Sequence, residues 1–160
     1  MEGDPIFLRP LTQADADTIF TFTSNPEVAK YMRFDQHRTV EEAAELLRNY
    51  MDIQNYGFMI CLRETERPIG VAALMQEKVR NCFSVSMYSA PEYWGNGYCS
   101  KALEQLIALG RGLELVQFTA HIVGDNQASR RMVEKVGFRL EKVLHFDDLP
   151  SGLYVYSYRF

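Results

Sequence analysis

The stretch YWGNGYCSKAL, from Tyr93 to Leu103, places two glycines around an asparagine directly before residues that favour a helix. The first turn of a helix leaves backbone N–H groups without partners, and the helix dipole makes that end positive. Glycines before this turn remove the side chains that would keep an anion at a distance. The sequence therefore predicts an anion site on the backbone amides of residues 95–100. A plain strand-to-helix turn that needs positive φ is the alternative for the GxG pattern alone.

The segments on either side of this turn predict a mixed α/β layout. Before it, the apolar runs FMICLR and IGVAALM stand on either side of the polar segment ETERP, which predicts a hairpin. Cys82–Ser89 alternates apolar and polar residues, which predicts a strand with two different faces. After it, we expect a helix from about Cys99 to Leu109 and a strand over Leu115–Val123. A helix that Asn126 caps and Gly137 ends follows, and then two final strands.

The N-terminal part predicts a strand followed by helices. IFLRPL, from Ile6 to Leu11, is typical of a strand. Thr39 and Glu42 form a capping box before a run with apolar residues at helical spacing. Gly57 is the expected stop of that helix.

Length and composition bound the class of protein. The chain has 160 residues, of which 47% are hydrophobic and 24% charged, and this balance predicts one globular α/β domain over residues 1–160. A net charge of −4 gives no bulk attraction to nucleic acid. The three cysteines form no metal-ligand cluster, and no apolar run reaches membrane-spanning length. We therefore expect a cytoplasmic protein without a metal, nucleic-acid or membrane partner.

Two motifs extend the glycine turn into a family resemblance. SMYSAPEYWGNGYCSKAL resembles the acyl-CoA binding motif of the GNAT family of N-acetyltransferases, and its Pro-x-Tyr-Trp-Gly-x-Gly-Tyr core resembles the RimJ/RimL branch. NQASRRMVEKVGFRLE, from Asn126 to Glu141, is similar to a second segment of that branch, and the opening IFLRPLTQAD and the segment ERPIG are similar as well. The resemblance covers most of the chain in the same order. It implies the GNAT fold, an α/β fold whose central, mostly antiparallel sheet splays between the strands at Phe83–Ser89 and Leu115–Val123 and is flanked by helices.

The resemblance also implies roles for the residues of these motifs. The strand edge at Met87, Tyr88 and Ser89 would pair with the pantetheine arm of acetyl-CoA, the co-substrate, as an extra strand does. An N–H of Met87 or Tyr88 would stabilise the oxyanion formed on attack. Asn126 would hydrogen-bond the arm, and Ser129 would reach the sulfur and protonate the leaving thiolate. The amides that would hold the diphosphate belong to Gly95, Asn96, Gly97, Tyr98, Cys99 and Ser100.

The proton acceptor is the least defined part of this predicted site. Relatives often place a glutamate where Thr119 stands, and a threonine cannot act as a carboxylate base. His121 lies on the same strand face as Thr119 and belongs to a residue type that titrates near neutrality. Glu92, next to the strand end, and Tyr88 or a water chain are the other candidates. A packed or edge histidine is the competing interpretation of His121.

Two further residues of the turn carry expectations. Trp94 is expected to anchor the turn in the core. Cys99 is expected at a helix N-terminus, a position that lowers the pKa of a thiol. A redox role and a tolerated small residue are the two interpretations of this cysteine.

The predicted activity is transfer of an acetyl group from acetyl-CoA to a primary amine by direct attack, because a thioester is already activated. The acceptor would be a protein N-terminus or a small-molecule amine, and the enzyme a monomer or a homodimer. A non-catalytic CoA-binding module that keeps the cradle but lacks the base is one alternative. A Rossmann-type nucleotide-binding domain is another, but that fold has its glycine loop after the first strand, whereas the loop here follows the middle of the chain.

Overall fold

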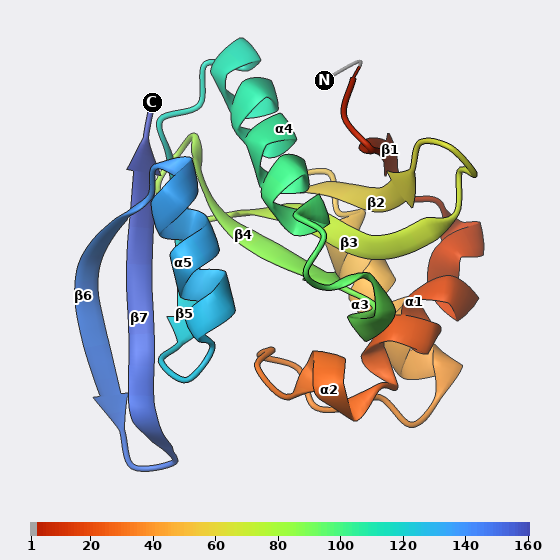
Figure 1. Cartoon of the computed structure of the whole chain (residues 1–160), viewed down its shortest axis with the longest axis horizontal. Helices are drawn as coiled ribbons and strands as arrows, with labels where there is room; N and C mark the ends of the chain where they lie inside the picture. Colours follow the sequence, from red (N-terminus) through yellow and green to blue (C-terminus); the bar gives the residue numbers. More distant parts are fainter. Residues whose placement is uncertain (1–2) are drawn as a thin grey trace.

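One mixed sheet of seven strands organises residues 3–160, the part of the chain that this computed structural model describes (Figure 1). The strand order is β1-β2-β3-β4-β5-β7-β6, and all neighbours are antiparallel except β4 and β5, which are parallel. The prediction of a mostly antiparallel α/β fold is confirmed. The strands are β1 (Ile6–Pro10), β2 (Tyr56–Leu62), β3 (Pro68–Gln76), β4 (Cys82–Ser89), β5 (Gln117–Val123), β6 (Arg139–Phe146) and β7 (Leu149–Arg159).

Helices cover both faces of the sheet, so two apolar cores form. Side chains alternate between the faces of a strand, and each face of the central strands buries its own set. One core lies under α1, α2 and α3 and includes Leu47 and Met59, and the other lies under α4 and α5 and includes Leu106 and Phe118 (Figure 1). The helices are α1 (Ala16–Thr23), α2 (Pro26–Ala29), α3 (Val40–Tyr50), α4 (Tyr98–Gly112) and α5 (Gln127–Val136), with short 3-10 turns η1 (Gln13–Asp15) and η2 (Pro91–Tyr93).

The predicted role of Gly57 as the stop of α3 is wrong. Helix α3 begins at the Thr39 and Glu42 capping box, as predicted, but it ends at Tyr50, and Gly57 lies within β2. A Cβ on Gly57 would lie 3.0 Å from the carbonyl oxygen of Tyr50 and 2.9 Å from Leu11. Glycine is needed here because β2 passes close to the end of the helix, which is a contact between segments and has no local sequence signal.

Strands β4 and β5 separate along most of their length. They pair only where Cys82–Ser84 lies beside Gln117–Thr119, and Ser84 with Thr119 is the last pair. Beyond that pair, β4 continues to Ser89, and no strand among residues 3–160 pairs with it on the β5 side. This splay is the one expected from the sequence, and it leaves a gap that is closed at the Ser84–Thr119 end and open toward the start of α4.

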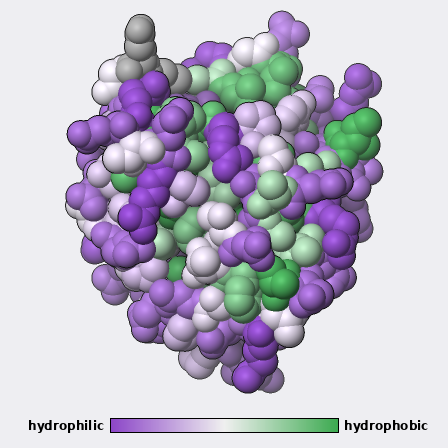
Figure 2. Space-filling view, turned by 90° about the vertical axis from the view of Figure 1, so that its right-hand side faces the viewer, coloured by the Kyte–Doolittle hydropathy of each residue, from purple (hydrophilic) through white to green (hydrophobic). Residues whose placement is uncertain are grey.

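The surface of the molecule is largely polar on the side that carries β1 and α1. Figure 2 shows this side, where hydrophilic residues surround small, separate hydrophobic areas. None of the helices formed by residues 3–160 combines the length and the hydrophobicity that a membrane span needs.

Candidate active site

The turn before α4 presents a row of free backbone amides. Lys101 is the first residue of α4 whose N–H returns to a carbonyl oxygen, that of Gly97, at 3.1 Å. The amides before it have no acceptor among residues 3–160, and the Asn96 side chain turns away to donate to the Tyr93 carbonyl at 3.1 Å. Those amides belong to Gly95, Asn96, Gly97, Tyr98, Cys99 and Ser100. Partnerless N–H groups at a positive helix end form an anion site.

The two glycines explain why this row stays open. Gly95 has a φ of 81° and Gly97 a φ of 76°, values that other residues rarely adopt. A Cβ built on either residue would meet nothing within 4 Å. The space before the amides is therefore not filled by the described part of the protein, and a bulky anion can approach the backbone.

The β4 edge of the gap carries main-chain groups that face β5. Ala90, directly after β4, donates its N–H to the carbonyl oxygen of Ile69 in β3 at 2.8 Å. Alternate residues of an antiparallel pair turn their N–H and C=O groups to the same neighbour, so Tyr88 also faces β3, whereas Met87 and Ser89 face the gap. The Tyr88 N–H therefore points away from the gap, and of the two predicted oxyanion donors only Met87 is turned toward it.

The β5 edge is arranged in the same way. Gly124 donates its N–H to Gly152, at the β7 side, at 2.9 Å. By the same alternation, the main-chain groups of His121 and Val123 face the gap. The Ser89 carbonyl accepts the Trp94 indole N–H, and the Val123 carbonyl accepts the Asn126 N–H at 2.9 Å. The peptide groups of Met87 and His121 and the N–H groups of Ser89 and Val123 have no partner within residues 3–160, so both walls can pair with an extended chain that carries amides of its own.

Asn126 is the N-cap of α5 and Ser129 lies in the first turn of that helix, shortly after the end of β5 at Val123. The Asn126 Oδ1 accepts the Ser129 N–H at 3.3 Å and caps the helix, as the sequence predicts. The cap uses the oxygen of the amide and leaves its NH₂ group as a donor. The Ser129 hydroxyl has no bonded partner within residues 3–160. Both groups remain available to a ligand in the neighbouring gap.

The turn is tied to the end of β4 through Ser89. The indole Nε1 of Trp94 donates to the Ser89 carbonyl at 2.9 Å, and the Cys99 thiol lies 3.5 Å from the Ser89 hydroxyl. Trp94 is 50% exposed, so the expectation that it lies in the core is wrong. Burial raises the pKa of the Cys99 thiol, and the Ser89 hydrogen bond opposes this to a smaller extent. The expected lowering is therefore not seen, because desolvation outweighs the helix end.

The sequence-derived candidates for proton acceptance differ in their surroundings. The Tyr88 hydroxyl lies 3.1 Å from that of Tyr50, and burial together with Tyr50 raises the Tyr88 pKa well above its ordinary value. Such a phenol stays neutral, so it does not fit the role of a base. Glu92 is exposed in η2, at the open end of the gap. His121 is an exposed residue on the same face of β5 as the buried Thr119, and burial of part of its ring, with Arg33, lowers its pKa.

A carboxylate that the sequence analysis did not single out lies at the closed end of the gap. The Thr119 hydroxyl donates to Oε1 of Glu77, a residue of the turn between β3 and β4. These residues are 42 positions apart, and the turn has no motif that marks Glu77 as functional. The signal that could have found it is geometric, since the β3–β4 turn must lie beside the first residues of β5 once the sheet order is known.

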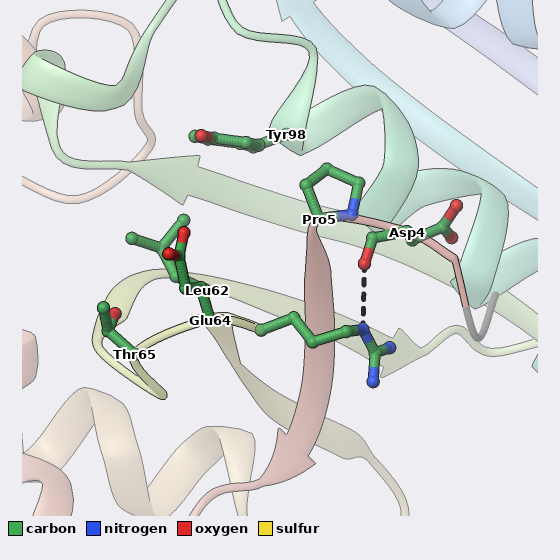
Figure 3. Close-up of a pocket in the computed structure, with 7 residues that line it drawn as sticks. Asp4, Pro5, Leu62, Glu64, Thr65 and Tyr98 are labelled. Carbon is green, nitrogen blue, oxygen red and sulfur yellow. Dashed lines mark hydrogen bonds between the residues drawn. The ribbon is translucent and has the colours of Figure 1, made fainter.

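A hollow of about 310 Å³ lies between the segment before β1, the end of β2 and the start of α4. Figure 3 shows Pro5, Leu62, Thr65 and Tyr98 around it. Arg63, which also lines the hollow, donates to the Asp4 carbonyl at 2.8 Å. None of the lining residues belongs to β4 or β5, and Tyr98, the first residue of α4, is the one member of the amide row that lines the hollow. Within residues 3–160, no group of three or more His, Cys, Asp or Glu side chains is arranged to hold a metal ion.

Comparison with known proteins identifies the fold and the family. A family model described as an acetyltransferase (GNAT) domain matches residues 6–139. The chain belongs to the GNAT acetyltransferase family. It is 30% identical to the uncharacterized N-acetyltransferase YoaA of Bacillus subtilis (strain 168), over 98% of this chain and 94% of that protein. It is 26% identical to the uncharacterized N-acetyltransferase p20 of Bacillus licheniformis, over 96% and 89%.

Solved GNAT structures share the architecture across nearly the whole chain. An acetyltransferase of the GNAT family from Bacillus anthracis superposes with a TM-score of 0.85 at 20% identity, covering 98% of this chain and 95% of that one. Spermidine N-acetyltransferase from Vibrio cholerae, in complex with CoA and spermine, gives 0.85 at 18% identity, with coverages of 97% and 95%. RimL, a ribosomal-protein alpha-N-acetyltransferase in complex with coenzyme A, gives 0.86 at 15%, with coverages of 99% and 96%.

Proposed function

We propose that this GNAT protein transfers an acetyl group from acetyl-CoA to a primary amine, by direct attack of the amine on the thioester. The observation that carries the proposal is the continuity of two features. The free amides of residues 95–100 lie at the open end of the gap between β4 and β5, and both walls of that gap carry unpaired peptide groups. A diphosphate joined to an amide-containing arm has the chemistry that this combination would bind.

The chain's own groups would divide the binding between them. The amides from Gly95 to Ser100 would hold the diphosphate, and Met87 and Ser89 would pair with the pantetheine arm along β4. The NH₂ group of Asn126 would donate to an arm carbonyl, because its oxygen already caps α5. With the diphosphate at the open end, the arm would run along β4 into the gap and bring the thioester toward Met87.

The same groups would stabilise the reaction. The Met87 N–H is turned into the gap, where it would donate to the oxygen that becomes negative when the amine attacks. The amine nitrogen forms the new C–N bond as the C–S bond breaks. The free hydroxyl of Ser129 would then give its proton to the leaving thiolate, and the proton that the nitrogen loses as the amide forms would replace the one lost by Ser129. No covalent enzyme intermediate is needed, because positioning two substrates supplies much of the rate gain.

Two acceptor classes fit this proposal. The RimL neighbour is a protein alpha-N-acetyltransferase, and the Vibrio cholerae neighbour is a spermidine N-acetyltransferase. At these identities the likeness concerns the fold alone. A peptide with a free N-terminus and a polyamine are therefore the two acceptors with which to begin.

The test is release of free CoA thiol from acetyl-CoA in the presence of spermidine or of a peptide with a free N-terminus. We expect thiol release that depends on the amine, with the acetylated product seen by mass spectrometry. Tight binding of acetyl-CoA without thiol release from any amine would support a non-catalytic CoA-binding module instead. Thermal stabilisation by NAD or ATP but not by CoA would contradict the cradle assignment.

A further inference from the structure

We propose that Glu77 is the proton acceptor of this reaction and that Thr119 holds its carboxylate in position; the inference rests on the proposed function. Neither residue belongs to the motifs that carry the family resemblance. The assignment comes from where the fold places the two side chains.

The turn that carries Glu77 is fixed independently of the Glu77 side chain. The Glu77 N–H donates to the Cys82 carbonyl at 2.9 Å. The Gln76 amide bridges the turn by donating to the carbonyls of Val79 and Cys82, both at 3.2 Å, and of Glu77 at 3.0 Å. A change of the Glu77 carboxylate to an amide therefore leaves these bonds in place.

Thr119 sets where the carboxylate lies. Thr119 pairs with Ser84 at the point where β4 and β5 begin to separate, and its hydroxyl donates to Glu77 Oε1. Its neighbours Phe118 and Ala120 are buried in the core under α4 and α5, so alternation turns the Thr119 side chain to the opposite face. Glu77 thus lies at the closed end of the gap, on the face away from α4 and α5.

A carboxylate at this place meets a chemical requirement of the reaction. An aliphatic amine resembles a lysine side chain, with a pKa of about 10.4, and is protonated near neutral pH. It must lose a proton before its lone pair can attack. Glu77 would take the ammonium proton and become a neutral carboxylic acid. The nitrogen then forms the C–N bond and the C–S bond breaks. Ser129 gives its proton to the thiolate, and the second proton that the nitrogen loses as the amide forms replaces it on Ser129.

The surroundings of Glu77 mix both signs of charge. His121 follows on the same face of β5, where the Glu77 carboxylate opposes the lowering of the His121 pKa by burial, Arg33 and Lys142. Burial raises the pKa of the Cys82 thiol, and the nearby Glu77 carboxylate raises it further. The other charged groups are Lys78 and Arg80 in the same turn, and Glu141, which accepts a bond from Ser157 on β7 and lies 3.6 Å from Arg159.

Glu77→Gln tests the assignment through its pH profile. The amide keeps the size of the side chain and can still accept the Thr119 hydroxyl bond. We expect kcat/KM for the amine to fall about 100-fold near neutral pH, the usual scale for loss of a general base. The difference in kcat/KM between Glu77→Gln and the wild type should shrink as the pH approaches the pKa of the amine, because the unprotonated amine needs no base. CoA affinity should be unchanged. Glu45→Gln, on the exposed side of α3, is the matched control.

A second variant moves the carboxylate within the bonded pair. In Glu77→Gln with Thr119→Glu, the charge returns to the same place from the β5 side. We expect at least tenfold recovery over Glu77→Gln alone, which a purely structural role of the pair would not produce. His121→Ala is measured in parallel and should lose less than Glu77→Gln.

The outcomes separate the two proposals. The role of Glu77 would be overturned if the loss of kcat/KM in Glu77→Gln were the same at every pH and were not recovered by the double variant. It would also be overturned if Glu77→Gln kept the kcat/KM of the wild type. A larger, pH-dependent loss in His121→Ala would transfer the role to that residue. If the wild-type protein releases no thiol with any amine, the proposed function itself fails.

Discussion

The indole N–H of Trp94 donates to the carbonyl oxygen of Ser89 at 2.9 Å and so joins the turn before α4 to the last residue of β4. Ser89 is the last residue of the β4 wall, at the open end of the gap, and Trp94 directly precedes the free amides of residues 95–100. The bond therefore couples the two parts of the proposed CoA site. Half of the Trp94 side chain is exposed beside them.

Trp94 should report binding of the coenzyme. It is the only tryptophan of the chain, so the indole emission comes from this one place. A diphosphate on the neighbouring amides changes the polarity around the ring, and we expect a saturable change in intensity or wavelength when CoA is added. Inorganic phosphate at the same concentration should give little change. Emission that stays constant while calorimetry detects binding would show that CoA lies elsewhere.

Gly97→Val should weaken CoA binding at least tenfold. A Cβ in this left-handed conformation costs about 1–2 kcal/mol, and the side chain would occupy the space that the diphosphate needs. Gly112→Ala is the control, since a Cβ there also meets nothing within 4 Å but lies in the last turn of α4. Calorimetric titration with CoA separates the effects. Equal affinity of both variants would contradict the amide cradle.

Tyr50→Phe and Tyr88→Phe should act on stability and leave turnover unchanged. Each change breaks the bond between the two buried hydroxyls, so each should lower the free energy of unfolding by about 1 kcal/mol. The double variant should cost less than the sum, because both single changes remove the same bond. Urea unfolding of the wild type, the two single variants and the double variant measures these free energies. A large loss of kcat in Tyr88→Phe would return Tyr88 to the list of catalytic candidates.

Cys99 should react slowly with iodoacetamide near neutral pH. The nucleophile is the thiolate, and burial raises the pKa of this thiol, so little thiolate is present. We expect at least tenfold slower alkylation than for glutathione, measured by peptide mass spectrometry, with the difference lost in urea. Rapid modification of the folded protein would instead support a redox role for Cys99.

Asp15→Asn should destabilise the protein at neutral pH but not in acid. The Arg9 guanidinium donates two bonds of 2.9 Å to the Asp15 carboxylate and holds its pKa below the usual 3.8, aided by the Thr12 N–H. A depressed folded pKa gives stability that is present above 3.8 and is lost as the pH falls through the folded value. Denaturation at neutral pH should show a loss of about 2 kcal/mol, and this loss should disappear as the pH falls through the folded pKa of Asp15. A pH-independent difference would exclude this ion pair as the cause.

The sequence by itself determined the features that depend on neighbouring residues. The glycines at positions 95 and 97, the caps at Thr39 and Asn126, and the stop at Gly137 all act within one turn of the chain. The alternation along Cys82–Ser89 likewise follows from strand geometry. These local rules, with the family resemblance, were enough to predict the splayed sheet and the position of the amide row. The start of α4 at Tyr98 differs from the prediction by one residue.

Tertiary structure decided the features that join distant segments. Glu77 meets Thr119 only because the β3–β4 turn returns beside β5, and Gly57 is required only because β2 passes the end of α3. The raised pKa of Cys99 and the exposure of Trp94 follow from how much protein surrounds each side chain. Short-range conformational preference sets backbone direction, whereas burial and long-range hydrogen bonds exist only after the chain has closed on itself. The place of the predicted site is therefore a property of the sequence, and the chemistry at its closed end is a property of the fold.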